Sequence, residues 1–145
     1  MSSRSNAPLP SLTPHEALVF AMVLVSAADR TMTDRELKTI GRIVTSMPAF
    51  VGFDQETLPA VADRCVAVLQ KPDGLEDGFA MIRAALTPAL CEAAYAFACD
   101  VVAADGRAEQ EELRVLEMMR HRLDVERLVA AAIERGARAR HARVG

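Results

Sequence analysis

The fold is decided by two stretches of the sequence: SAADRTMTDRELKTIGRIV at residues 26–44 and VAADGRAEQEELRVLEMM at residues 102–119. At an offset of 76 residues they align with one Ala-Ala-Asp turn over the other. After each turn, apolar residues recur at the i, i+3, i+4 spacing of an amphipathic helix. Each stretch therefore predicts a helix, an acidic turn and a second helix, and their similarity predicts an internal duplication of this helix-loop-helix unit.

Helix-start signals outside these stretches mark further helices. Thr13, Pro14 and Glu16 combine an N-cap hydroxyl, a proline at the first helical position and the glutamate of a capping box, and Thr87-Pro88 repeats the first two features. The helices expected from these signals and from apolar periodicity cover residues 13–28, 33–47, 59–70, 73–86, 87–104, 109–121 and 124–136. The sequence thus predicts an all-α fold, a single compact bundle of about seven helices.

Composition bounds the domain organisation. The chain has 145 residues, 51% of them hydrophobic and only 4% aromatic, which suits one aliphatic helical core. Residues 1–12 are small, polar and proline-containing, so we expect a disordered lead-in there. The helical domain is expected over residues 13–136, followed by a basic flexible tail over residues 137–145.

The cysteines and the apolar runs predict a cytoplasmic protein. Cys65, Cys91 and Cys99 are odd in number, lack CxxC spacing and lie in apolar stretches, as core thiols of a reducing compartment do. The N-terminus has no apolar segment typical of a secretory signal. Charged residues interrupt every run well short of the roughly 20 residues of a transmembrane helix, so none is expected.

The candidate site consists of four acidic residues in the two turns. Asp29 and Glu36 in the first copy match Asp105 and Glu112 in the second, with the Glu seven positions after the Asp in each. If the copies pack together, these carboxylates form an all-oxygen cluster, the ligand type that hard divalent cations such as Ca²⁺ or Mg²⁺ require. The spacing does not fit an EF-hand, because Arg107 and Leu116 fall where ligands are needed.

Helix capping is the structural alternative for the same residues. Glu36 completes a capping box with Thr33, so its carboxylate has a purely local role available. Glu112 has Glu109 in the cap position, where no hydroxyl is available, so capping explains the second copy less well. Both interpretations remain open at this level.

The Ala-Ala-Asp-Gly turn followed by an acidic helix start resembles the TerB-like family of tellurite-resistance proteins. The resemblance covers about residues 13–136 and is strongest in the two stretches quoted above. It implies an all-α fold, no enzymatic activity, and a role in resistance to tellurium oxyanions and chemical stress through acidic, metal-binding surfaces and membrane-associated complexes. Arg30 replaces the glycine of the motif in the first copy, so if only one turn binds a cation, we expect the turn of Asp105 to do so.

No catalytic motif is present, which predicts a protein that is not an enzyme. GxSxG, GxGxxG, P-loop and His-Glu-x-x-His patterns are missing, and Glu117 with His121 is typical of a solvated i, i+4 pair. The arginines of the C-terminal segment lack aromatic residues for base stacking, so nucleic acid is not expected as a partner. The C-terminal arginines are Arg135, Arg138, Arg140 and Arg143.

Two main functional hypotheses follow. The first is a non-enzymatic TerB-like stress-response protein in which a divalent cation at the acidic turns tunes association with partners. The second is an interaction or scaffold domain whose acidic turns only cap helices. Both predict protein partners and allow a homo-oligomer. An enzyme acting through paired carboxylates is the least favoured hypothesis.

Overall fold

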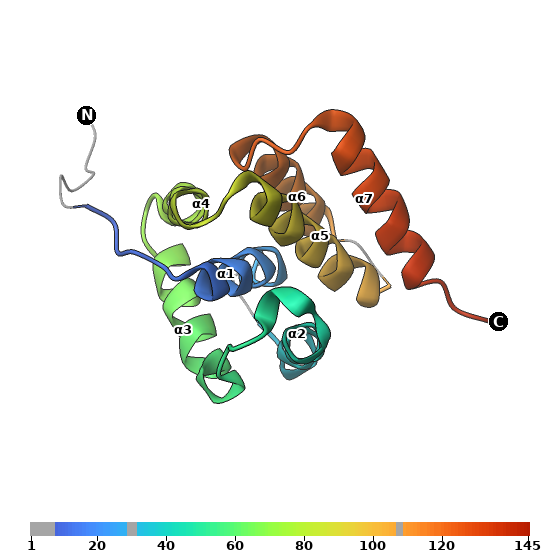
Figure 1. Cartoon of the computed structure of the whole chain (residues 1–145), viewed down its shortest axis with the longest axis horizontal. Coiled ribbons are helices and arrows are strands. Elements are labelled where there is room, and N and C mark those ends of the chain that lie inside the picture. Colours follow the sequence, from blue (N-terminus) through green and yellow to red (C-terminus); the bar gives the residue numbers. More distant parts are fainter. Residues whose placement is uncertain (1–7, 29–31, 107–108) are drawn as a thin grey trace.

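A computed structural model describes residues 8–28, 32–106 and 109–145 (Figure 1). Within these ranges the chain has seven α-helices, two short 3-10 helices and no strand. The α-helices are α1 (Pro14–Ser26), α2 (Asp34–Ser46), α3 (Leu58–Leu69), α4 (Gly74–Ala85), α5 (Pro88–Ala104), α6 (Gln110–Arg122) and α7 (Arg127–Arg140), and the 3-10 helices are η1 (Pro48–Phe50) and η2 (Gln55–Thr57). The predicted all-α fold is confirmed, whereas the internal duplication remains a prediction.

Helix α1 is the centre of the bundle. Every residue from Ala17 to Ser26 is buried, because the helix is apolar on all sides and has neighbours on all sides. Helices α3, α4 and α5 pack most extensively against it, and α2 and α6 also contact it (Figure 1). Helix α7 packs on the far side of α5 and so extends the bundle outward.

The capping box predicted at the start of α1 is present. The Thr13 N–H donates to Glu16 Oε1 at 2.9 Å, and the Glu16 N–H donates to Thr13 Oγ1 at 3.1 Å. Arg64 of α3 adds an ion pair to Glu16 Oε2 at 2.8 Å. The hydrogen bond from the Thr13 N–H, with Arg64 beside it, holds the pKa of Glu16 below its usual value. One local signal thus starts α1 and also ties it to α3.

The start and end of α7 differ from prediction. Asp124 does not cap the helix, because its φ of 55° places it in the turn, and Glu126 is the N-cap instead. The helix also continues past Gly136 to Arg140, so the segment expected as a tail begins in helix. Ala137 is buried against the bundle, and this packing supports the extra turn.

The remaining expectations about the fold concern thiols and membrane spans. Cys65, Cys91 and Cys99 are free and buried, as core thiols should be. Burial raises the pKa of the Cys99 thiol to about 12, so it stays protonated at neutral pH. None of the helices in the described ranges is long and apolar enough to cross a membrane.

Candidate functional site

The first turn of α2 holds Glu36 in a complete capping box. The Glu36 N–H donates to Thr33 Oγ1 at 3.2 Å, and Glu36 Oε1 accepts both the Thr33 N–H at 3.2 Å and the Thr33 hydroxyl at 2.9 Å. Glu36 is half-buried, and its charge lies at the positive N-terminal end of the α2 dipole. Asp29 lies outside the described residues.

The turn between α5 and α6 places the second aspartate at the surface. Asp105 is the C-cap of α5 and is exposed. Gly106 follows it with a φ of 72°, and its N–H donates to the Ala103 carbonyl oxygen at 3.2 Å. This left-handed turn is the one that the glycine predicts, because residues with a Cβ rarely adopt it.

Glu112 caps α6 from the first turn of that helix. Its Oε1 accepts the Glu109 N–H at 3.0 Å, which is the half of a capping box that does not need a hydroxyl at the cap position. The expectation that capping accounts poorly for Glu112 is therefore wrong. Unlike Glu36, Glu112 is buried, with 8% of its surface exposed.

Two of the predicted site residues act electrostatically on a third, Glu112. Burial raises the pKa of the Glu112 carboxyl, and the hydrogen bond from Glu109 opposes that rise. The negative charges of Asp105 and Glu36 raise the same pKa further. The turns before α2 and α6 therefore approach each other, which their separation in the sequence does not reveal.

This approach is looser than a closed coordination shell. Over residues 8–28, 32–106 and 109–145, no three His, Cys, Asp or Glu side chains are grouped closely enough to hold a metal ion. Glu36 and Glu112 each direct one carboxylate oxygen, Oε1, to a cap. A carboxylate has a second oxygen and about four lone-pair sites, so capping and ligation do not exclude each other.

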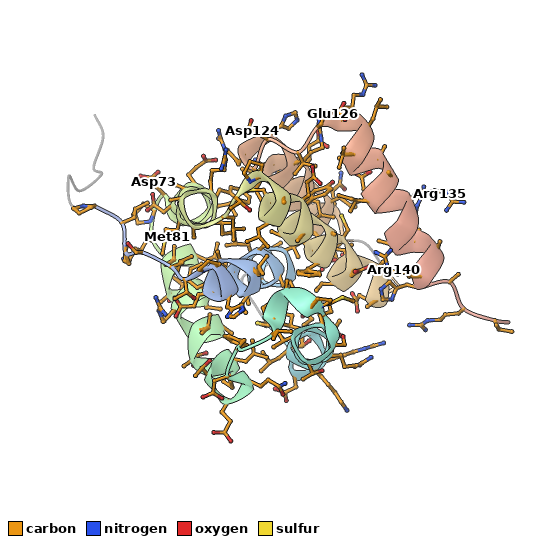
Figure 2. All side chains as sticks on the ribbon, viewed as in Figure 1. Asp73, Met81, Asp124, Glu126, Arg135 and Arg140 are labelled. Carbon is orange, nitrogen blue, oxygen red and sulfur yellow. The ribbon has the colours of Figure 1, made fainter. Side chains whose placement is uncertain are left out.

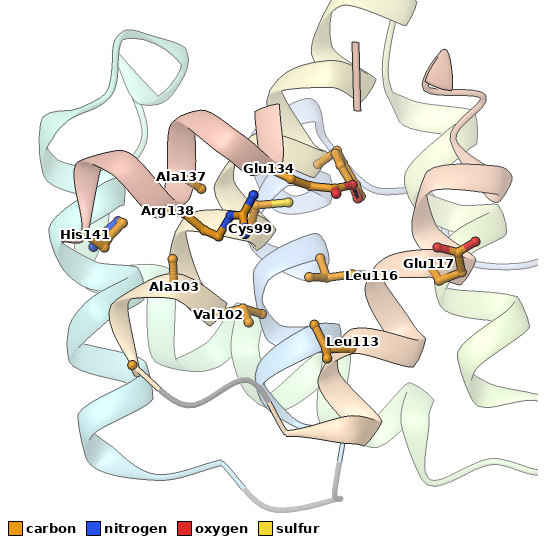
Figure 3. Close-up of a pocket in the computed structure, with 12 residues that line it drawn as sticks. Cys99, Val102, Ala103, Leu113, Leu116, Glu117, Glu134, Ala137, Arg138 and His141 are labelled. Atoms are coloured by element: carbon orange, nitrogen blue, oxygen red, sulfur yellow. Dashed lines mark hydrogen bonds between the residues drawn. The ribbon is translucent and has the colours of Figure 1, made fainter. Parts of the chain in front are cut away.

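The sequence analysis did not predict a groove that lies beside the second turn. It has a volume of about 600 Å³, lies between α5, α6 and α7, and extends to Gly106 (Figure 3). We call it the α6–α7 groove. The spacing of Glu134, Arg138 and His141 along α7 is the one signal that could have revealed it, because residues at i, i+4 and i+7 share a helix face.

The pair of Glu117 and His121 is solvated, as predicted. Glu117 Oε1 lies 3.3 Å from His121 Nε2, with the Glu117 side chain 67% exposed and that of His121 61% exposed. Arg120 lies 3.8 Å from the same carboxylate oxygen. Exposed pairs of this kind contribute little to stability.

An all-helical bundle with two acidic inter-helix turns is the class of protein that these observations define. The family model described as tellurite resistance protein TerB matches residues 15–135. The chain therefore belongs to the TerB family. No curated protein and no solved structure matches the chain significantly.

Proposed function

We propose that this TerB-family chain is a non-enzymatic stress-response protein of the tellurite-resistance type. In this proposal, Asp29, Glu36, Asp105 and Glu112 hold a divalent cation between the two acidic turns. Calcium and magnesium are the candidates, because both prefer carboxylate oxygens. The bound cation would adjust how the protein associates with partner proteins in the cytoplasm, including membrane-associated ones.

The observation that carries the proposal is the burial of Glu112, which is 8% exposed, near other carboxylates that raise its pKa. A buried carboxyl group whose pKa is raised by two further carboxylates from separate turns is a place where a cation relieves both burial and repulsion. Asp105 is exposed and at the turn, so it is accessible to an incoming ion. Binding there would join the turn before α6 to the turn before α2.

Calorimetric titration tests the proposal. The chelator-treated chain is titrated with Ca²⁺, Mg²⁺ and Mn²⁺, alongside Asp105→Asn and the matched control Asp63→Asn. Asp63 is an exposed aspartate of α3 outside the two turns. The proposal expects saturable binding of at least one ion, at least tenfold weaker in Asp105→Asn and unchanged in Asp63→Asn. Equal binding by all three proteins, or none by the wild type, contradicts it.

A scaffold function is the second candidate, and the hydrogen bonds of the two glutamates favour it. Glu36 and Glu112 both accept the backbone N–H of their own N-cap residue, at 3.2 and 3.0 Å. Each therefore has a structural role without any ion. In that case, glutamine at both positions would leave partner binding intact and independent of chelators, as a pull-down with and without chelator would reveal.

A further inference from the structure

The floor of the α6–α7 groove is apolar and nearly closed to water. Tyr95, Cys99 and Val102 of α5 are 2%, 4% and 6% exposed. Leu113 and Leu116 of α6 form one wall, and Leu113 at the lip is 50% exposed (Figure 3). A buried apolar floor beneath a partly exposed apolar lip suits the alkyl chain of a small ligand.

The wall that α7 contributes is charged. Glu134 precedes Arg138 by four residues, the order that favours an ion pair along a helix. Glu134 is engaged elsewhere, because its Oε2 accepts the Tyr95 hydroxyl at 2.6 Å. Among the described residues, no carboxylate lies within ion-pairing distance of Arg138.

The two basic residues that follow Arg138 most closely, Arg140 and His141, have an acidic partner that Arg138 lacks within the described ranges. Asp100 of α5 has a nearly buried side chain, and its Oδ1 lies 2.8 Å from an Arg140 guanidinium nitrogen and 3.4 Å from His141 Nε2. One carboxylate therefore serves both groups. Among the residues that the structure describes, Arg138 has no acidic partner at the edge of this apolar groove, an arrangement that suits an anionic head group on an apolar chain.

We propose that the α6–α7 groove binds a free single-chain alkyl carboxylate, with its carboxylate on Arg138 and its chain between Val102 and Leu116. Glu117 and Glu134 also line the groove, and their negative charges orient the ligand with its head toward His141 (Figure 3). The site does not depend on a cation at the acidic turns.

The net charge of α7 disfavours the other occupants. Arg127, Arg135 and Arg138 are all exposed on α7, so a second copy packed face to face on this helix would bring like charges together. An alkyl cation would meet the same repulsion. A neutral alkyl chain would fill the floor but leave the guanidinium of Arg138 without a partner.

The test uses the full chain and measures binding by isothermal calorimetry, with each probe kept below its micellar concentration or solubility limit. The probes are dodecanoate, dodecanol and dodecyltrimethylammonium, single-chain amphiphiles whose head groups are anionic, neutral and cationic. The proposal expects saturable one-to-one binding of dodecanoate, about tenfold weaker binding of dodecanol, and no binding of the ammonium. Decanoate, two methylenes shorter, should bind roughly tenfold more weakly than dodecanoate.

A matched pair of variants separates Arg138 from the general charge of α7. Arg138→Gln should weaken dodecanoate binding about tenfold and leave dodecanol unaffected. Arg135→Gln makes the same change on the outer side of the helix, away from the groove, and should alter neither (Figure 2). Leu113→Glu changes an already exposed position and should weaken the binding of both dodecanoate and dodecanol.

Three results would overturn the proposal. One is the failure of wild-type protein to bind dodecanoate saturably. Another is equal binding of dodecanoate and dodecanol. The third is an equal loss in Arg138→Gln and Arg135→Gln, which would show that surface charge and not the groove recruits the probe.

Discussion

The two acidic turns differ in how they use the same spacing of residues. Before α2, a threonine hydroxyl and Glu36 close a full capping box, and the glutamate stays half-buried. Before α6, Glu109 takes the cap position, a glycine makes the left-handed turn, and Glu112 is buried. One turn satisfies its acid locally, whereas the other carries an acid whose pKa is raised by its surroundings.

Under the proposed function, helix capping and the cation site would share Glu36 and Glu112. A cap fixes where the carboxylate lies by using one of its oxygens. Burial and neighbouring acids then decide whether the negative charge is satisfied. Glu36 and Glu112 hold equivalent cap positions, but the second lies where a cation would stabilise the protein more.

The largest expected effect comes from core substitutions in α2 and α6, the helices that follow the two turns. Ile40 of α2 is fully buried, whereas its counterpart Leu116 of α6 is 8% exposed and borders the α6–α7 groove. Ile40→Ala should lower the free energy of unfolding by about 3–4 kcal/mol, and Leu116→Ala by about 2 kcal/mol, because a cavity open to the groove fills with water. Urea denaturation measures both variants, and a larger loss of stability in Leu116→Ala would contradict this difference in burial.

The glycine of the second turn gives the next effect. Gly106→Ala should lower the free energy of unfolding by about 1–2 kcal/mol, because an alanine Cβ is disfavoured at a φ of 72°. Gly136→Ala is the control, since Gly136 lies within α7 and an added Cβ meets only the end of the Arg140 side chain at 3.2 Å. That variant should be neutral or raise stability by about 0.5 kcal/mol. Thermal unfolding compares the two variants, and an equal loss of stability in both would be inconsistent with a left-handed turn at Gly106.

The Thr33 hydroxyl of the first turn should contribute about 1 kcal/mol to the free energy of unfolding. Thr33→Ala removes both the acceptor for the Glu36 N–H and the donor to its carboxylate. Thr45→Ala, later in α2, removes a hydroxyl that only donates to the Arg42 carbonyl oxygen at 2.9 Å, so it should cost nothing measurable. Chemical denaturation of the two variants compares them, and no loss in Thr33→Ala would show that the cap is dispensable.

The smallest effect is a pH dependence of the second turn. Because the pKa of Glu112 is raised in the folded state, the folded protein binds more protons than the unfolded one above pH 4.5. The contribution of Glu112 to stability is therefore greatest below that pH and falls as pH rises through the folded pKa of Glu112. Glu112→Gln should remove this fall and raise stability at pH 7 by about 0.5–1 kcal/mol, the usual size of a relieved like-charge contact.

Glu111→Gln is the matched control for the pH experiment. Glu111 is an exposed acid in the same first turn of α6, next to Glu112. Between pH 4 and pH 8, the melting temperature of Glu111→Gln should still fall as pH rises. The melting temperature of Glu112→Gln should no longer show this fall. An unchanged decline in both variants would mean that another group causes it.

Local chemistry predicted most of the fold but only part of the site. Thr-x-x-Glu capping boxes and the glycine of the second turn act within a few residues, so they can be recognised from the sequence. The role of Glu112 was misjudged, because a glutamate can bond its own cap residue without a hydroxyl there. The ion pair of Asp100 with Arg140 joins residues 40 positions apart, and no local sequence pattern predicts it.

The groove was invisible to sequence analysis for a similar physical reason. Its lining comes from three helices whose mutual placement is set by packing on α1 and α5. Leu113 and Leu116 simply continue the apolar stripe of α6 in the sequence. That Leu113 remains half exposed depends on where α7 lies, and the helix period does not contain that information.

Thermal unfolding with and without a cation tests the central claim most directly. The chelator-treated wild type is compared with the double variant Asp29→Asn, Asp105→Asn, each with excess Ca²⁺, Mg²⁺ or Mn²⁺. A ligand at a hundredfold excess over its Kd stabilises the folded state by about 2.7 kcal/mol. We expect one ion to raise the wild-type melting temperature by about 5–10 °C and to leave the double variant unmoved. No shift with any ion, or an equal shift in both proteins, would contradict a cation site at the acidic turns.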